Sequence, residues 1–521
     1  MATRPKDFDY SERRPSMWAP FAVRDFRLLF IGFTLGQAMM PLQFVTQIFW
    51  VQSHADPSVA IILIGVIGTM RGTGMLSFGL FGGALADRFD RRKLLMATQG
   101  GALILNLSIA AIMWLTPGDT PALVAFFILT FFASSMFAVD GPTRQAIVPE
   151  ILGPRLTPGG IALNTAAMQL AMPISIFGVG ILVTEIGFAG TYALSGLGHV
   201  MEIVTLGAMA YRSNFVRQAS HGFKETIRDV GDGLSYTRRH SAVLWIIILL
   251  VVMMALGFPP TANLGPTWVT TVVGVSFAKF GFIALGWGGG AFLASTLLTR
   301  FAAIDRKGLL VAGGAVLFTV SFLIFSIGTT WPFAVIGNIG LGMGMATTQV
   351  SSTSLIAAMT PNHVRGRVMS LLMLNMGVAQ AVTLPIAILG QAVSLQTMFP
   401  ILAFISIVLV GAIVIFRPSI WRARVSTALS EQASAESEAR AEVEARTAPH
   451  PVEDPPQHIP STPPLPTPTQ TTALPAIATL HPVLLAAARD HPNKTDAKTD
   501  AKPTAKRIPK PARPRLAPTE D

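Results

Sequence analysis

The chain has 521 residues, of which 51% are hydrophobic and only 13% are charged, and its mean hydropathy is +0.53. This composition excludes an ordinary soluble domain and is typical of a polytopic membrane protein. The formal net charge is +11, and the absence of cysteine excludes disulfides, thiolate metal sites and cysteine lipidation.

The first 25 residues are polar and charged, and the apolar run after them is too long for the core of a cleavable signal peptide. Twelve apolar runs follow, each long enough for a transmembrane helix of about 20 residues. They cover 26–50, 58–86, 94–116, 120–139, 158–184, 188–211, 242–268, 277–299, 308–328, 332–357, 368–393 and 397–416. A helix satisfies its own backbone hydrogen bonds in hydrocarbon. The expected fold class is therefore an all-α polytopic membrane protein with twelve transmembrane helices.

Basic residues concentrate in alternate connecting segments. Lys and Arg are frequent in the N-terminus, in the loop 87–93 and in 212–240, whereas the alternate set of segments contains one lysine, Lys279. By the positive-inside rule the basic segments face the cytoplasm. Both termini are then expected in the cytoplasm, with the spans in the cytoplasmic (inner) membrane of a bacterium. The net charge needs no nucleic-acid partner.

The chain repeats itself weakly. Pro173 and Pro385 lie 212 residues apart inside corresponding spans, and "DRRKLL" at 90–95 corresponds to "DRKGLL" at 305–310. A doubled six-helix unit with a cavity between its halves is a transporter architecture. The expected parts are a cytoplasmic N-terminus (1–25), an N-terminal six-helix half (26–211), a cytoplasmic linker (212–240), a C-terminal six-helix half (241–416) and a disordered cytoplasmic tail (417–521).

One loop carries a specific motif. The sequence "GALADRFDRRK" at 83–93 is similar to the G-x-x-x-D-R-x-x-R-R-K/R motif of the major facilitator superfamily, and it stands between the second and third spans, where that family places it. The stretches 140–152, 232–240 and 365–372 resemble the drug- and siderophore-exporting branch of the superfamily. The resemblance implies the major facilitator fold, in which two pseudo-symmetric six-helix halves transport by alternating access.

The resemblance assigns a gating role to the first-half loop, since Thr299 stands where the acidic residue would repeat in the second half. It implies that Asp87 lies against the start of the eleventh helix near 367–370, where a helix N-terminus favours negative charge. A pair between Arg91 and Asp140 would hold it there. The expected gating residues are Gly83, Asp87, Arg88, Arg91, Arg92, Asp140 and Arg144. The alternative is a set of solvated charges worth about 0–1 kcal/mol per pair.

Charged residues inside the spans are candidate functional residues, because a charge in the membrane is costly. In the functional interpretation Arg71 contacts a substrate anion or pairs with a titrating acid. In the structural interpretation it is held by a charged partner or by backbone carbonyls. Glu202 follows His199 by three residues and so shares its helix face. It is either the proton-carrying group or a structural residue, because this family places the sixth helix at the periphery of its half. Two such ligands are too few for a metal site.

Neutral polar residues add Gln37 of the first span and Asn164 of the fifth to the substrate or proton candidates. Such groups either bond between helices or line the cavity, which in this family is formed by helices one, four, seven and ten. Met39, Met40 and Phe44 in the first span predict a mainly apolar lining that suits large amphipathic solutes.

The sequence contains no H-E-x-x-H, G-x-S-x-G or P-loop motif, so neither an enzyme nor direct ATP coupling is expected. The prediction is a secondary active transporter, a proton- or ion-coupled exporter of an amphipathic small molecule such as a drug, siderophore or secondary metabolite. The alternatives are an uptake symporter on the same fold and a non-transporting membrane sensor or enzyme. The expected partners are the substrate, protons and the lipid bilayer, with no cofactor, metal or nucleic acid, and the expected functional unit is a monomer.

Overall fold

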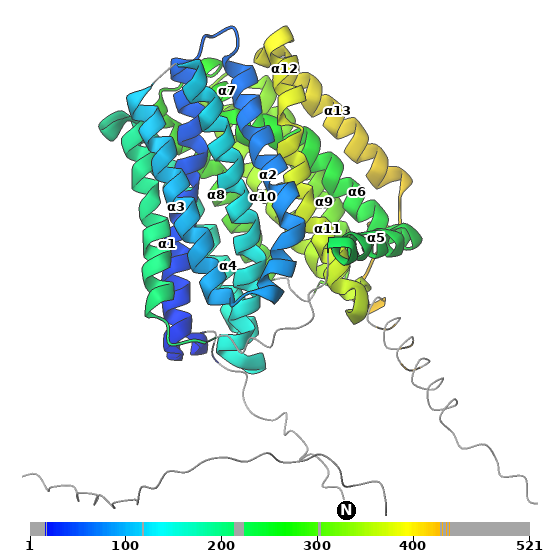
Figure 1. The fold of residues 1–521 in the computed structure, drawn as a ribbon. Coiled ribbons are helices and arrows are strands. Elements are labelled where there is room, and N and C mark those ends of the chain that lie inside the picture. The colour runs from blue at the N-terminus through cyan, green and yellow to red at the C-terminus, as the bar shows by residue number, and fades with distance from the viewer. Residues whose placement is uncertain are drawn as a thin grey trace, which may run out of the picture. The chain divides into compact units, whose positions relative to one another are not determined.

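The computed structural model describes residues 16, 18–116, 119–212, 223–300 and 304–427, and three single residues at 430, 434 and 437. All regular elements in these parts are helices (Figure 1). They are η1 (Ala19–Ala22), α1 (Arg24–His54), α2 (Ala60–Arg88), α3 (Arg91–Leu115), α4 (Thr120–Ala208), α5 (Phe223–Arg239), α6 (Ser241–Phe258), η2 (Pro259–Asn263), α7 (Gly265–Thr271), α8 (Phe277–Arg300), α9 (Lys307–Ile327), α10 (Trp331–Met359), α11 (Asn362–Ala381), α12 (Thr383–Val393) and α13 (Leu395–Phe416).

The 89-residue helix α4 is divided at two glycines. Gly153 (φ 67°, ψ 171°) and Gly187 (φ 74°, ψ 176°) have non-helical backbone angles. Glycine adopts positive φ without steric cost because it has no Cβ atom. The three resulting parts, 120–152, 154–186 and 188–208, are called here the first, second and third segments of α4.

Nine helices in the described part are long and apolar enough to cross a membrane, judged by length and composition. This confirms the predicted all-α polytopic class. The predicted number of twelve spans stays a prediction. Among the nine, α4 counts once although it has three segments, and the 29-residue helix α10 does not count.

Prolines interrupt two of the later spans because proline has no N–H to donate. Pro259 and Pro260 begin the π-helical turn η2, in which Leu264 N–H donates to the Pro259 carbonyl at 2.9 Å. In the same way Pro385 cannot bond the carbonyl of Ala381, four residues earlier, and the chain breaks between α11 and α12.

Thr69 of α2 fills the break between α11 and α12. Its hydroxyl donates to the Ala381 carbonyl at 3.0 Å and accepts from Leu384 N–H at 3.1 Å. The backbone groups that the break leaves free thereby fix α2 against α11 and α12.

The helices α1–α4 also contact α6–α13 near the loop 55–59. Gln52 Nε2 donates to Thr270 Oγ1 at 2.8 Å, and the rings of Phe49 and Phe277 lie 4.4 Å apart. This end of the bundle is therefore closed by direct side-chain contact between the two groups of helices.

The chain after α13 packs back onto the start of α9. Ile420 is fully buried, Gly308 N–H donates to the Ala423 carbonyl at 3.2 Å, and Asp305 accepts from Ser426 N–H at 2.7 Å. Residues 417–427 are thus ordered, unlike the tail predicted to be disordered from residue 417. The remaining tail, apart from the single residues named above, lies outside the described part.

Candidate functional site

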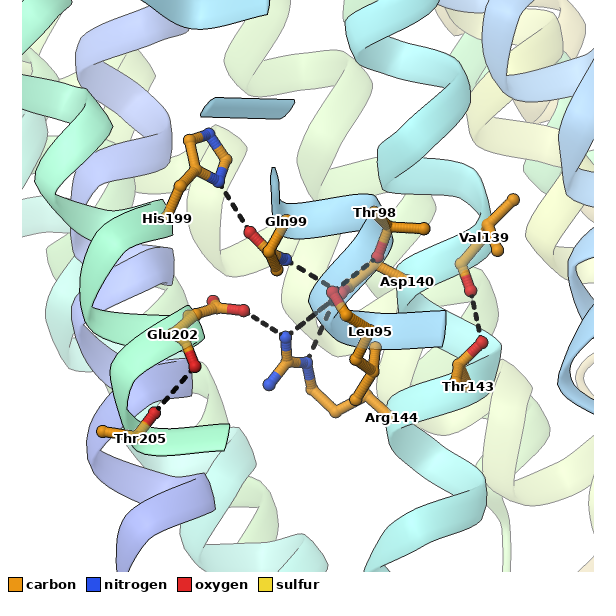
Figure 2. Close-up of polar contacts among 10 residues, drawn as sticks. All are labelled: Leu95, Thr98, Gln99, Val139, Asp140, Thr143, Arg144, His199, Glu202 and Thr205. Atoms are coloured by element: carbon orange, nitrogen blue, oxygen red, sulfur yellow. Dashed lines mark hydrogen bonds and ion pairs between the residues drawn. The ribbon is translucent and has the colours of Figure 1, made fainter. Parts of the chain in front are cut away.

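Six polar side chains form a continuous chain of hydrogen bonds among α1, α3 and α4. Figure 2 shows all of them except Gln43. We call them the polar cluster. They are Gln43 of α1, Gln99 of α3, Asp140 and Arg144 of the first segment of α4, and His199 and Glu202 of its third segment.

Arg144 lies between two carboxylates (Figure 2). Its Nη2 is 3.0 Å from Asp140 Oδ2 and also pairs with Glu202 Oε2, and the side chains of Arg144 and Glu202 are each only 6% exposed. With both acids ionised the three groups carry a net charge of −1. An uncompensated buried charge is costly.

His199 connects this charge to α1 through amide groups. His199 Nε2 is 3.0 Å from Gln43 Nε2, and its Nδ1 is 2.6 Å from Gln99 Oε1. The amide nitrogen of Gln43 can only donate, so this amide orientation makes His199 Nε2 the acceptor and assigns the proton to Nδ1, which donates to Gln99 Oε1. Gln99 Nε2 in turn donates to Asp140 Oδ1 at 2.8 Å.

A cavity of about 80 Å³ adjoins the polar cluster. All members of the cluster except Arg144 line it, together with Gln37, Met40 and Tyr192 among others. One buried water needs roughly 10–15 Å³, whereas drug-sized ligands occupy about 300–1,000 Å³. This cavity therefore suits several waters and a mobile proton rather than a large solute.

The third segment of α4 presents opposite faces to protein and membrane. Leu197 and Val204 are exposed, whereas Glu202 is 4% exposed. Gly36 of α1 gives Glu202 its place, since the Glu202 carboxylate occupies the position where a Cβ atom at Gly36 would stand. Glu202 thus lies inside the bundle although its helix also faces outward.

Arg71 of α2 is buried separately from the cluster. Its Nη2 donates to the Phe44 carbonyl at 3.1 Å and to Gln47 Oε1 at 2.5 Å, and its Cζ lies 3.8 Å from the centre of the Phe44 ring. The contact with the Phe44 carbonyl agrees with a structural role for Arg71. Both hydrogen bonds use Nη2, however, so they leave the interpretation as a contact for an anion open.

The implied pair between Arg91 and Asp140 is not formed. Arg91 pairs with Glu150, and Asp140 pairs with Arg144. Asp140 and Glu150 are ten residues apart on one helix segment, which corresponds to about 15 Å. Arg91, the first residue of α3, reaches only the nearer of the two acids.

Arg92 joins α3 to the end of α4. Its guanidinium donates to the carbonyls of Leu206 and Gly207, each at 2.7 Å, and of Tyr211 at 3.3 Å. Leu206 and Gly207 belong to the last turn of α4, and a cation is favoured at a helix C-terminus.

The other gating residues fall partly outside the described part. The backbone at Gly83, Asp87 and Arg88 is helical, but their side chains are not described. Arg367, in the region expected to receive Asp87, pairs with Asp232 of α5 at 2.9 Å.

Two further candidates differ in position. Gln37 lines the cavity, whereas Asn164 does not, and Asn164 Oδ1 is buried without a hydrogen-bond partner among the described residues. Sequence analysis did not single out Gln99 or Tyr192. The signal that could have found them is a hydrogen-bonding group inside an apolar span, where it needs a partner.

The chain is similar to known membrane transporters. Residues 28–384 match the model of the Major Facilitator Superfamily. The chain is 22% identical over 359 residues to the enterobactin exporter EntS of Shigella boydii serotype 4 (strain Sb227), covering 68% of this chain and 80% of the exporter. EntS of Escherichia coli O1:K1 / APEC matches with the same identity and coverage.

Solved structures share the arrangement of helices. A POT family transporter in complex with a thioalcohol-conjugated peptide has a TM-score of 0.61 at 14% identity, covering 76% of this chain and 96% of that one. A D-xylose-proton symporter has a TM-score of 0.57 at 12% identity, covering 76% and 97%. At these identities the likeness extends to the fold alone.

Proposed function

Because the chain belongs to the major facilitator superfamily of membrane transporters, we propose that it is a proton-coupled exporter of an amphipathic small molecule. It works by alternating access between two six-helix halves, 26–211 and 241–416, that make up twelve spans. It acts as a monomer in the inner membrane of a bacterium, with both termini in the cytoplasm.

The observation that carries the proposal is the polar cluster. It holds two carboxylates against one guanidinium in a buried site beside a small cavity. Intramembrane acids of this kind mark proton relays. Glu202 is the proton-carrying group, and its release from Arg144 on protonation is the step that couples the proton to a change in helix packing.

The direction of transport rests on resemblance to an exporter. EntS, at 22% identity, is an exporter by name, and the positive-inside rule places the loop 55–59 outside the cell. The contacts of α1–α4 with α6–α13 near that loop then correspond to a state closed toward the outside. Asp87 on the opposite side gates the reverse state, as the loop motif implies.

The experiment has two stages. An untargeted comparison of the metabolites that a deletion strain and its parent release identifies the substrate. Flux of that compound is then measured in proteoliposomes with and without an imposed pH gradient, for the unchanged protein, for Glu202→Gln and for Glu150→Gln. Glu150 is the matched control, because it also pairs with an arginine but lies outside the cluster.

We expect the pH gradient to drive flux in the unchanged protein and in Glu150→Gln, and to lose its effect in Glu202→Gln. Equal gradient-driven flux in all three would contradict the assignment of Glu202. Movement of the substrate in the same direction as the protons would show an uptake symporter instead of an exporter. No flux of any released metabolite would favour a sensor or enzyme.

A further inference from the structure

Arg71 is a buried cation in the middle of α2. It is 3% exposed, and both of its hydrogen bonds to α1 use the same nitrogen, Nη2, one to the Phe44 carbonyl and one to Gln47 Oε1. The Phe44 ring covers one face of the guanidinium at 3.8 Å. The other terminal nitrogen, Nη1, is buried and has no hydrogen-bond partner in the part of the chain that the structure describes.

No carboxylate of the described residues lies within ion-pair distance of Arg71, whereas Arg144 in the same group of helices has two. A guanidinium has five N–H donors and no acceptor. Both its charge and the Nη1 donors therefore have no partner among the described residues. A structural clamp explains Nη2 but gives no role to Nη1, and an unpaired charge at this depth is costly.

Gln47 fixes the orientation of Arg71. The Gln47 Nε2 donates to Tyr192 Oη at 2.9 Å and to Thr130 Oγ1 at 3.2 Å, so its Oε1 is held toward Arg71. A donor that is already oriented loses little freedom when a ligand binds, which is the property of a preorganised site.

Arg71 also lies next to the cavity of the polar cluster. Met40 and Gln43 line that cavity, and they precede Phe44 and Gln47 by four residues, or about one helical turn of 5.4 Å. Tyr192 lines it as well and contacts Gln47. A ligand held by Arg71 is thus close to the acids that are proposed to carry the proton.

We infer that Arg71 binds the anionic group of an organic substrate, a carboxylate, phenolate or phosphate, through Nη1. The inference rests on the proposed transport function and narrows its substrate class to amphipathic anions. Arginine suits this role because its planar fork of donors matches the oxygens of such groups.

The test measures binding to the purified full-length protein without any gradient. The probes are 4-butylbenzoate, 4-butylbenzylamine and 4-butylbenzyl alcohol, which have the same apolar group and differ in charge, and chloride is the inorganic control. Variants are Arg71→Gln, Arg71→Lys and Arg417→Gln. Arg417 is the matched control, because its guanidinium also stacks on an aromatic ring, Trp245 at 4.0 Å, but lies after the last span.

We expect the benzoate to bind the unchanged protein at least about tenfold more tightly than the alcohol or the amine does. Loss of a hydrogen bond to a charged group weakens binding by roughly 10- to 100-fold, so Arg71→Gln should bind the benzoate more weakly by that factor. Arg71→Lys, which keeps the charge but not the planar fork of donors, should show a smaller loss of affinity, and Arg417→Gln should bind the benzoate as tightly as the unchanged protein. The partial loss in Arg71→Lys keeps the test informative if Arg71→Gln does not fold.

Equal binding of benzoate and alcohol, or unchanged benzoate binding in both Arg71 variants, would overturn the inference. Chloride competing away the benzoate at equal concentration would overturn it too, since the site would then be one for small inorganic anions. The proposed proton coupling fails separately. Glu202→Gln is expected to keep benzoate binding, and gradient-independent flux with Arg71-dependent binding would contradict the coupling alone.

Discussion

Arg144 and Arg91 both pair with glutamates, but water reaches the two pairs to different extents. The Arg144–Glu202 side chains are 6% exposed, whereas Arg91 and Glu150 are 21% and 33% exposed. Removing one partner of a buried pair costs about 3–5 kcal/mol, and an exposed pair contributes about 0–1 kcal/mol. Arg144→Gln should therefore lower the free energy of unfolding by several kcal/mol and Arg91→Gln by about 1 kcal/mol or less.

Thermal unfolding in detergent measures this difference. Adding Glu202→Gln to Arg144→Gln removes one of the two uncompensated acids, so the double variant should recover part of the lost stability. If Arg144→Gln and Arg91→Gln unfold at the same temperature, the buried ion pairs do not hold the cluster together.

At the residue scale the sequence predicted which side chains matter better than it predicted their partners. Arg71 and Glu202 were singled out because charges are rare in apolar spans. Glu202 and Arg144 are 58 residues apart, and only the rotation of each helix about its axis decides whether they meet. The pair between Arg91 and Asp140 is implied by the family resemblance alone, and nothing local in the sequence indicates that Arg91 lies beside Glu150, about 15 Å from Asp140 along the helix.

Among the elements, the break between α11 and α12 depends on Thr69. Thr69→Val keeps the side-chain shape but leaves the Ala381 carbonyl and Leu384 N–H without partners. An unsatisfied buried group costs about 1–3 kcal/mol, so this variant should unfold at a lower temperature. Thr73→Val is the control, since among the described residues the Thr73 hydroxyl bonds to carbonyls of its own helix, those of Thr69 and Met70. Equal unfolding temperatures for the two variants would show that Thr69 does not join α2 to the break.

The segment after α13 is held by one fully buried side chain and one acid. Deleting the chain after Thr427 should leave the unfolding temperature unchanged. Deleting the chain after Arg417 also removes Ile420, whose burial contributes about 1.5–3 kcal/mol, and should lower the unfolding temperature. If both deletions behave like the full chain, the packing of residues 417–427 adds no stability.

The contribution of Asp305 should depend on pH. The N–H and hydroxyl of Ser426 donate to its carboxylate and lower its pKa. A carboxylate whose pKa is lower in the folded than in the unfolded protein stabilises the fold at pH values above its unfolded pKa of about 3.9. This contribution disappears as the pH falls through the pKa of the folded state. The difference in unfolding temperature between the unchanged protein and Asp305→Asn should thus be constant from about pH 8 to pH 5 and shrink below pH 4. A difference that grows toward low pH would contradict this sign.

At the element scale, hydropathy located the helices but not their interruptions. The ends of α1 and α13 follow the predicted runs within a few residues, because apolar length sets them. The break beside Pro385 could be anticipated from the missing N–H, but the hydroxyl that fills it comes from a residue 312 positions away. The order at 417–427 could not be read from this polar segment itself, because the contacts that fix it are with Gly308 and with Asp305, 121 positions before Ser426.

For the whole molecule, alternating access requires that the contacts near the loop 55–59 open and close. Cysteines replacing Gln52 and Thr270, whose side chains touch at 2.8 Å, should be linked by a short bifunctional reagent. We expect the link to stop transport of the substrate identified above. The native chain has no cysteine, so no other thiol interferes.

Cysteines at Asp305 and Ser426 provide the control for this cross-link. Their side chains touch at 2.7 Å, and both lie outside the spans and away from the cavity, so a link between them should leave most transport intact. Full transport with Gln52 and Thr270 linked would mean that this contact does not have to open.

The most direct test of proton coupling by Glu202 follows the cavity without any substrate. A single cysteine replaces Ala133, which lines the cavity, and its rate of labelling is divided by that of a cysteine at the exposed Ser58 to correct for thiol reactivity. In the otherwise unchanged protein and in Glu150→Gln, we predict that this ratio changes with pH along a curve for the binding of one proton. In Glu202→Gln we predict that the ratio is independent of pH. An unchanged pH dependence in Glu202→Gln would contradict the account.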